Sequence, residues 1–496
     1  MNLLNHIQKI CQRPKSQHLK KRTGLSSIML LLLLSSCSWL DVRSKSEIEI
    51  DEMFKNKDGF YSSLTGVYNN MGQAELYGKN LPLYTMEPLT QQYTTSEYNL
   101  DRIQWAKFNY NTSLGETMVS QIWSNMYHTI VNCNIVIEEL EKGSLAFFED
   151  GVQPILHAEA LALRSYMYFD LIRMFNDSYK VNSECKNVPY KDDFGFSLGR
   201  QISSKELLEQ LTKDLKTAAE ELKQYDPIVT GQKYTDKYVQ YDRTKRMNYY
   251  AVIALLARIE IYRENYPEAF AYAQEVLNCD KFRYIKEDEI VKKDAYGAIT
   301  QIDYLFTPEI IFGLYNENII STSRTYYEVL NEDFVVSTNC YESGDVRQCW
   351  LYTNPSANNK INFIRYQRST LQEDASKYPT SVVPMLKRSE MALIAAECAL
   401  KQPSLGNPIE YLNALKESRN TTLLSDNAAE ENIDKEITHE YICDFKGEGQ
   451  LFYFYKRQNA TSIDNGKYNG NKVTMSTAYY RFPLPKYEED FGYGYK

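Results

Sequence analysis

Long stretches with apolar residues at helical spacing, arranged in consecutive pairs, constrain the fold of this chain more than any other feature. The paired stretches lie at 117–141 with 154–175, at 247–262 with 267–277, and at 387–401 with 408–418. In the second pair, small residues such as Ala257, Ala269 and Ala273 fall where the two antiparallel helices of a tetratricopeptide unit approach each other. Each pair can bury its apolar face only against a neighbouring pair. The sequence therefore predicts a mainly α fold with a tetratricopeptide-like scaffold of helical pairs.

Two long segments between these pairs differ from them in composition and in the spacing of apolar residues. Residues 76–113 and 280–383 are rich in Tyr, Asn, Ser, Thr and Asp and show little sustained period, which predicts irregular loops and short strands. Loops longer than about 15 residues in a compact protein are usually functional or disordered. Their aromatic content argues against disorder. We therefore expect one domain, residues 37–496, in which the helices form the scaffold and these two segments form the ligand-binding surface.

The composition excludes some classes of partner. The net charge is −9, and a basic cluster precedes Cys37, so the rest of the chain is more acidic still and repels phosphate backbones. Only 5 His are present, which leaves little material for a site built on several histidines. The 41 Tyr are unusual, and tyrosine combines an apolar face with a polar tip. These features favour an amphipathic ligand over a nucleic acid.

The first 37 residues have the pattern of an export signal. An apolar run of about eleven residues at 24–34 follows the basic cluster and is too short to span a bilayer, which needs about 20 residues. Leu34-Ser35-Ser36-Cys37 resembles a bacterial lipobox. The sequence therefore predicts a lipoprotein signal peptide over 1–36 and lipidation of Cys37; a plain signal peptide that ends near a cysteine is the alternative. Acyl chains would then anchor the protein to a membrane.

Besides Cys11 and Cys37 the chain has seven cysteines, so at least one thiol stays unpaired. Cys340 and Cys349 bracket a short polar segment; they would close a loop if oxidised, or remain two thiols. Neither a CxxC motif nor Cys/His spacing for zinc is present, so we expect neither metal nor cofactor.

The order of several short motifs resembles the SusD/RagB lipoproteins of Bacteroidota. These motifs are the lipobox with Ser38-Trp39-Leu40-Asp41-Val42, Trp123 and Tyr127 in a helix ending near Leu140, Ala158 to Tyr166, the pair at 247–277, Ala395-Ala396-Glu397, Leu412 to Arg419, Gly447-Glu448-Gly449 and Arg481-Phe482-Pro483-Leu484-Pro485. The resemblance implies a surface lipoprotein of the outer membrane that captures nutrients. Its ligands would be oligosaccharides, or alternatively peptides, and it would act as the lid of a SusC-like TonB-dependent transporter.

Two departures from the family pattern indicate a divergent member. The family often shows Glu-Arg where this chain has Glu440-Tyr441. The run 448–455 lacks the Arg and Asp that relatives carry there. The identity of the ligand therefore cannot be inferred from the ligand of a relative.

A sugar has an apolar ring face and an equator of hydroxyls, so its site needs flat aromatic rings beside short polar groups. Loop residues of these types are the candidate ligand contacts: Tyr93, Tyr98, Asn99, Arg102, Trp105, Tyr326, Tyr327, Trp350 and Tyr352. The alternative is that these aromatic rings pack their own loops or contact the transporter. Arg102 and Arg324 could bind a carboxylate of an acidic sugar or a peptide, or they could pair with neighbours such as Asp101.

Catalytic motifs are missing from the sequence. It contains no GxSxG, HExxH or glycine-rich phosphate loop. We therefore expect a binding protein rather than an enzyme. A surface hydrolase and a pure protein–protein scaffold of tetratricopeptide type remain as rival interpretations.

Overall fold

The computed structural model describes residues 45–94, 100–195, 197–325, 335–336, 340–354, 360–366, 381–466 and 471–491. The chain divides into two units, residues 1–56 and 57–496. In the first unit the described helix is α2 (Lys45–Met53). All elements below belong to the second unit. Within the described ranges, the helices are too short or too polar to cross a membrane.

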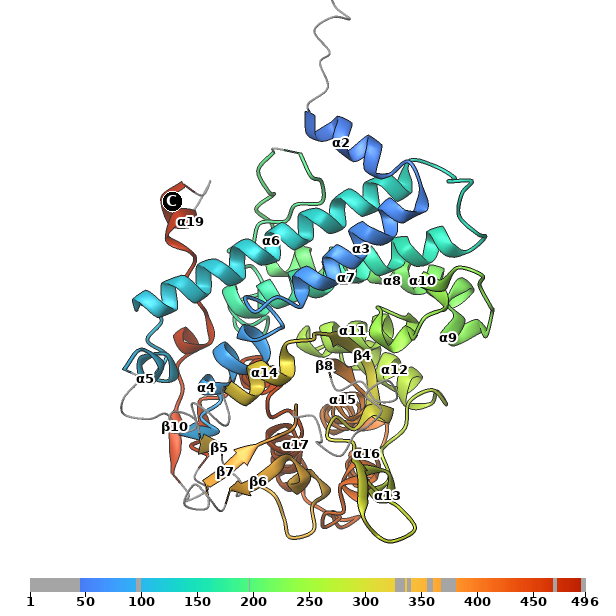
Figure 1. The fold of residues 1–496 in the computed structure, drawn as a ribbon. Coiled ribbons are helices and arrows are strands. Elements are labelled where there is room, and N and C mark those ends of the chain that lie inside the picture. Colours follow the sequence, from blue (N-terminus) through green and yellow to red (C-terminus); the bar gives the residue numbers. More distant parts are fainter. Residues whose placement is uncertain are drawn as a thin grey trace, which may run out of the picture. The chain divides into compact units, whose positions relative to one another are not determined.

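The expected helical pairs are present and form a continuous scaffold. The long helices are α3 (Lys57–Met71), α6 (Ser113–Glu141), α7 (Val152–Phe175), α8 (Ser204–Tyr225), α11 (Tyr249–Tyr262), α12 (Tyr266–Leu277), α15 (Arg388–Lys401), α16 (Pro408–Arg419), α17 (Glu430–Asp444) and α18 (Gln450–Gln458). Consecutive neighbours pack together, α6 on α7, α7 on α8, α11 on α12, α12 on α15 and α15 on α16 (Figure 1). The mainly α, tetratricopeptide-like prediction is confirmed.

Helix α7 forms the centre of this scaffold. Every residue from Ala158 to Phe175 is buried, so the helix is covered on all sides. Its buried charges have partners: Arg164 Nη2 lies 2.7 Å from Asp214 Oδ2 on α8, and Glu159 pairs with Arg243. Pairing offsets part of the desolvation cost of burying these groups.

Short elements connect the scaffold helices. They are α4 (Met86–Leu89), α5 (Leu100–Ala106), α9 (Pro227–Thr230), α10 (Lys237–Gln240), α13 (Glu287–Ile290), α14 (Ile319–Arg324), α19 (Lys486–Phe491), the π-helical η2 (Asn80–Thr85) and the 3-10 turns η3 (Arg243–Lys245), η4 (Thr307–Glu309), η6 (Val346–Trp350), η8 (Pro403–Leu405) and η9 (Thr477–Tyr480). Segment 76–113 is therefore more helical than predicted. The reason is an apolar set in it, with Leu81, Leu83, Met86 and Leu89, that is buried and favours compact helical turns.

The described strands form five two-stranded antiparallel sheets. They pair β1 (Tyr93–Thr94) with β5 (Val335–Val336), β2 (Val291–Lys293) with β3 (Ile299–Ile302), β4 (Ile310–Tyr315) with β8 (Val382–Lys387), β6 (Leu351–Asn354) with β7 (Lys360–Phe363), and β9 (Ser462–Asp464) with β10 (Lys472–Thr474). Seven of these strands fall within 280–383 or at its end, as predicted for that segment.

The two non-scaffold segments meet. Tyr93 pairs with Val336 in the β1–β5 sheet, and Asn316 Nδ2 donates to the carbonyl oxygen of Gly72 at 3.1 Å. The β9–β10 hairpin also reaches this region, because Gly466 has a φ of +68° and a Cβ there would lie 2.5 Å from the carbonyl oxygen of Gln91. The fold thus gathers residues near 91–93, 336 and 466.

Candidate ligand-binding site

Trp105 lies in the interior on the inner face of α5. Its side chain is 2% exposed, and its Nε1 donates to the carbonyl oxygen of Thr85 at 2.8 Å. The ring contacts Tyr110 and Phe482, with centroids 4.9 and 5.3 Å away. The expectation that Trp105 stacks on a ligand is therefore corrected: here the ring packs the core.

Trp350 and Tyr93 are corrected for the same reason. Trp350 is fully buried; its Nε1 donates to the carbonyl oxygen of Tyr304 at 2.7 Å, and the Arg365 guanidinium lies 4.1 Å from its ring centroid. Tyr93 is 8% exposed and its hydroxyl donates to the buried Glu87 carboxylate. These rings pack their own segments, which is the alternative stated above.

Tyr352 remains a candidate ligand contact, whereas Arg102 is buried and packs inside its own segment. The buried Arg102 guanidinium lies 4.4 Å from the centroid of Tyr84, and Lys79 Nζ lies 5.1 Å from the same ring. Burial, helped by the charge of Arg102, lowers the pKa of Lys79. Tyr352 is 49% exposed on β6. Tyr98, Asn99, Tyr326, Tyr327 and Cys37 lie outside the described residues.

A pocket of about 660 Å³ opens between α17, α18 and the β9–β10 hairpin. We call it the C-terminal pocket. Its lining combines aromatic, aliphatic, neutral polar and charged side chains: Asp434, Lys435, Glu436, Ile437, Thr438, His439, Ile442, Phe454, Tyr455, Gln458, Ala460, Ser462, Ile463, Asp464 and Lys472. The hairpin that forms one wall packs on Gln91, two residues before Tyr93.

The inner wall of the C-terminal pocket is aromatic and rigid. Phe454 stacks on Tyr441 with centroids 4.0 Å apart. Tyr455 is 3% exposed, and its hydroxyl has no hydrogen-bond partner among the described residues. Polar groups surround this wall, including Ser462 and Asp464 from β9. An apolar wall with a polar rim suits a ligand with an apolar face and peripheral hydroxyls.

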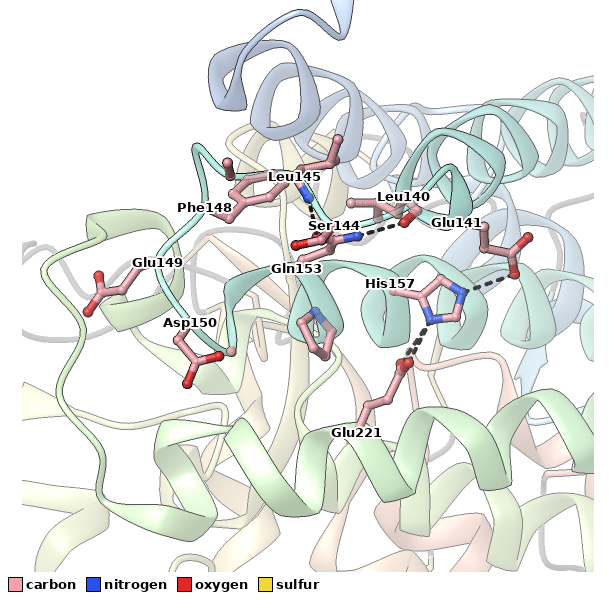
Figure 2. Close-up of a pocket in the computed structure, with 13 residues that line it drawn as sticks. Leu140, Glu141, Ser144, Leu145, Phe148, Glu149, Asp150, Gln153, His157 and Glu221 are labelled. Atoms are coloured by element: carbon pink, nitrogen blue, oxygen red, sulfur yellow. Dashed lines mark hydrogen bonds and ion pairs between the residues drawn. The ribbon is translucent and has the colours of Figure 1, made fainter.

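A second pocket, of about 570 Å³, lies where the loop after α6 enters α7 (Figure 2). We call it the acidic pocket because Glu141, Glu149, Asp150 and Glu221 line it. His157 Nδ1 lies 2.9 Å from Glu221, and its Nε2 lies 3.4 Å from Glu141 Oε1. Burial lowers the pKa of His157, but the hydrogen bond and the charge of Glu221 outweigh burial and raise it.

Three carboxylates of the acidic pocket, those of Glu141, Glu149 and Glu221, bind other residues of the same chain. Besides the two that hold His157, Glu149 Oε2 accepts hydrogen bonds from the backbone N–H of Thr235 at 3.0 Å and from its hydroxyl at 2.8 Å. These contacts join α6, α7 and α8 and the segment before α10. The acidic pocket is thus explained by scaffold packing.

Across the described ranges, no group of three or more His, Cys, Asp and Glu side chains is placed to hold a metal ion. The C-terminal pocket was not identified from the sequence, because its residues come from three elements between 434 and 472. The aromatic run Phe452-Tyr453-Phe454-Tyr455 was its one available signal.

Comparison with known proteins places this fold. Residues 38–261 match a SusD-like family model, described as starch-binding and associating with the outer membrane. SusD-like protein P2 of Formosa agariphila is 23% identical over 444 residues, which cover 80% of this chain and 81% of that protein. A SusD superfamily protein of Bacteroides thetaiotaomicron has a TM-score of 0.68 at 20% identity, over 88% of this chain and 98% of its own.

A SusD-like carbohydrate binding protein of Bacteroides vulgatus has a TM-score of 0.63 at 17% identity, over 88% of this chain and 96% of its own. These solved structures share the helical scaffold of this protein over nearly their whole length. The chain is thus similar to SusD-like proteins in sequence over residues 38–261, and it shares the fold of the solved SusD superfamily structures over most of its length.

Proposed function

We propose that this protein binds nutrient oligosaccharides at the cell surface, in the C-terminal pocket, without cleaving them. The observation that carries the proposal is the lining of this pocket, in which the accessible polar side chains Ser462, Asp464 and Lys472 stand over an apolar floor that includes the largely buried Phe454. The names of the family model and of the Bacteroides vulgatus neighbour, which refer to starch and carbohydrate, support this ligand class.

The wider role follows from the same proposal. The protein, anchored in the outer membrane by lipids on Cys37, would deliver its ligand to a SusC-like TonB-dependent transporter and act as its lid. Tyr352 and the candidates outside the described residues would extend the contact surface toward that partner or toward longer ligands.

Affinity need not be high for such a role. A sugar ring that removes about 50 Å² of apolar surface from water contributes about 1 kcal/mol. A few such contacts with accompanying hydrogen bonds give a dissociation constant near the millimolar range. A transporter that closes over the ligand would raise the retention of a weakly held oligosaccharide.

The test uses affinity electrophoresis of the purified protein in gels that contain neutral polysaccharides, followed by calorimetry with matching oligosaccharides. Asp464→Ala removes a hydrogen-bond acceptor for ligand hydroxyls and should weaken binding about tenfold, since a hydrogen bond to a charged group contributes about 1.5–3 kcal/mol. Ser462→Ala removes an exposed hydroxyl of the pocket lining, so it should weaken binding without lowering stability. Asp150→Asn, in the acidic pocket, is the control that should bind as the wild type does.

Each outcome has a distinct meaning. Retardation without product release supports capture, and product release would support the hydrolase. Binding of peptides but of no polysaccharide would support the peptide alternative, and binding of neither would support the scaffold. Normal affinity of both pocket variants would move the site away from the C-terminal pocket.

A further inference from the structure

Cys340 and Cys443 lie in contact although the sequence separates them by 103 residues. The Cys443 thiol donates to the carbonyl oxygen of Cys340 at 3.3 Å. The Tyr341 hydroxyl donates to the carbonyl oxygen of Cys443 at 3.2 Å, which holds this segment against α17. Cys340, Cys349 and Cys443 are all free thiols in this structure, and Cys443 is the one in contact with Cys340.

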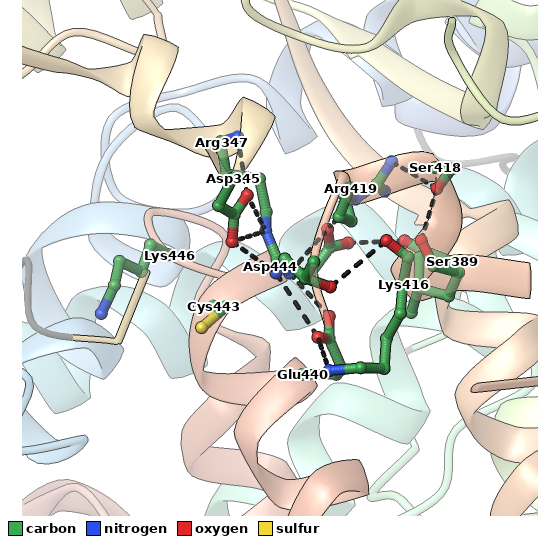
Figure 3. Close-up of polar contacts among 12 residues, drawn as sticks. Asp345, Arg347, Ser389, Lys416, Ser418, Arg419, Glu440, Cys443, Asp444 and Lys446 are labelled. Atoms are coloured by element: carbon green, nitrogen blue, oxygen red, sulfur yellow. Dashed lines mark hydrogen bonds and ion pairs between the residues drawn. The ribbon is translucent and has the colours of Figure 1, made fainter. Parts of the chain in front are cut away.

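Positive groups surround the thiol pair. The Lys446 ammonium is buried and has no hydrogen-bond partner among the described residues. Figure 3 shows Cys443 and Lys446 on the same side of the polar network that contains Arg347. His439 Nε2 lies 3.5 Å from Cys443 Sγ.

These charges favour one ionised sulfur in the pair. Burial alone would raise the pKa of Cys340, but the hydrogen bond with Cys443 and the charges of Lys446 and Arg347 outweigh burial and lower that pKa to about 6. Burial and the neighbouring Cys340 raise the pKa of Cys443. A thiolate in contact with a thiol is the arrangement that thiol–disulfide exchange requires.

We propose that Cys340 and Cys443 become a disulfide in the exported protein, by exchange with a small external disulfide such as oxidised glutathione. The Cys340 thiolate attacks one sulfur of the external disulfide and releases one thiolate. Cys443 then gives its proton to His439 and attacks the Cys340 sulfur, which releases the second thiolate. Two protein thiols are oxidised and one external disulfide is reduced to two thiols.

The bond would join the segment before η6 to α17. It would close a long loop that contains β6, β7, β8, α15 and α16, and a crosslink that closes a long loop restricts the unfolded chain most. Because both thiols are buried, we expect the exchange to occur late in folding, when Cys340, Cys443 and His439 have met but the external disulfide still has access to them. The proposal rests on export and not on the identity of the ligand.

The test is peptide mapping of full-length protein isolated from cells, alkylated in denaturant before digestion. We expect a linked peptide pair that contains Cys340 and Cys443 and lacks two hydrogens relative to the separate thiols. We expect the other five thiols (Cys133, Cys185, Cys279, Cys349 and Cys398) to be alkylated. Full alkylation of both Cys340 and Cys443, or a link from Cys340 to Cys349, would overturn the proposal.

A second measurement separates the bond from general effects of oxidation. Protein refolded in oxidised glutathione should have a higher denaturation midpoint than protein refolded in a reducing buffer. Cys443→Ser should lose this difference, and Cys398→Ser, a buried thiol on α15, should keep it. An equal difference in Cys443→Ser would contradict the pairing.

Discussion

At the scale of single residues, Arg347 shows how this protein buries charge. Its guanidinium is fully buried, 2.8 Å from Asp345 and 2.7 Å from Glu440, and Asp444 lies beside it (Figure 3). Arg419 and Lys387 also bind Asp444, and although burial alone would raise the pKa of Asp444, their charges lower it well below its usual value. Glu440, which Tyr441 follows in this chain, is thus paired with an arginine from a distant turn, η6.

We predict that Arg347→Met destabilises the protein by about 3–5 kcal/mol, because it leaves buried carboxylates without their partner. Chemical denaturation measures this loss. Lys435→Met is the control: Lys435 pairs with Glu431 on an exposed face of α17, so its removal should leave the unfolding midpoint unchanged. Similar midpoints for the two variants would contradict the structural role of Arg347.

The buried position of Trp105 leads to a second prediction. Trp105→Ala removes a ring that packs between Tyr110 and Phe482, and it should cost about 3–5 kcal/mol of unfolding free energy. Tyr352→Ala, at an exposed position, should cost little stability. Denaturation curves of both variants test this. A Trp105→Ala protein with normal stability and weakened ligand binding would show that Trp105 contacts the ligand instead of packing the core.

His157 makes stability depend on pH. Its pKa is raised in the folded state by the carboxylate of Glu221 despite burial, so its contribution is full below about pH 6.5 and is lost as the pH rises through the folded-state pKa. We predict that the difference in melting temperature between wild type and His157→Gln is larger near pH 5.5 than near pH 8.5. His128→Gln, exposed on α6, is the control. A difference that grows with pH would contradict this account.

At the scale of elements, helix ends were harder to predict than helix interiors. The apolar spacing of α8 is clear in the sequence, but it is compatible with either Ser203 or Ser204 as the N-cap. In the structure Ser203 caps the helix and forms a capping box with Glu206. A shift of one residue leaves the apolar face unchanged, so the periodicity carries no information about the cap.

We predict that Ser203→Ala costs about 1 kcal/mol of unfolding free energy, because the N–H of Glu206 loses its acceptor. Ser203→Gly should cost only a few tenths of that amount, since glycine is itself a good N-cap. Equilibrium denaturation of the two variants provides the comparison. Equal losses would show that burial of the side chain, and not the cap, explains the effect.

At the scale of the whole molecule, the scaffold was predictable and the pocket was not. A short stretch of sequence is enough to predict each helix of a pair, because its apolar residues repeat every three to four positions. The C-terminal pocket joins His439, Phe454 and Asp464 from three elements, and only their packing brings them together. The prediction that aromatic loop residues contact the ligand failed for a related reason. A tryptophan such as Trp350 can pack inside its own segment as readily as against a ligand, and here it is buried.

We expect the location of the protein to depend on residues before the scaffold. We predict that Cys37→Ala moves the protein from the membrane fraction to the soluble fraction, because anchoring depends on acyl chains whose buried CH₂ groups contribute about 0.8 kcal/mol each. Cys11→Ala is the matched control: it lies in the segment that the signal peptidase would remove, so the variant should stay in the membrane fraction. Fractionation of cells followed by immunoblotting measures both. A Cys37→Ala protein that stays with the membrane would mean that another part of the chain, or the transporter itself, holds it there.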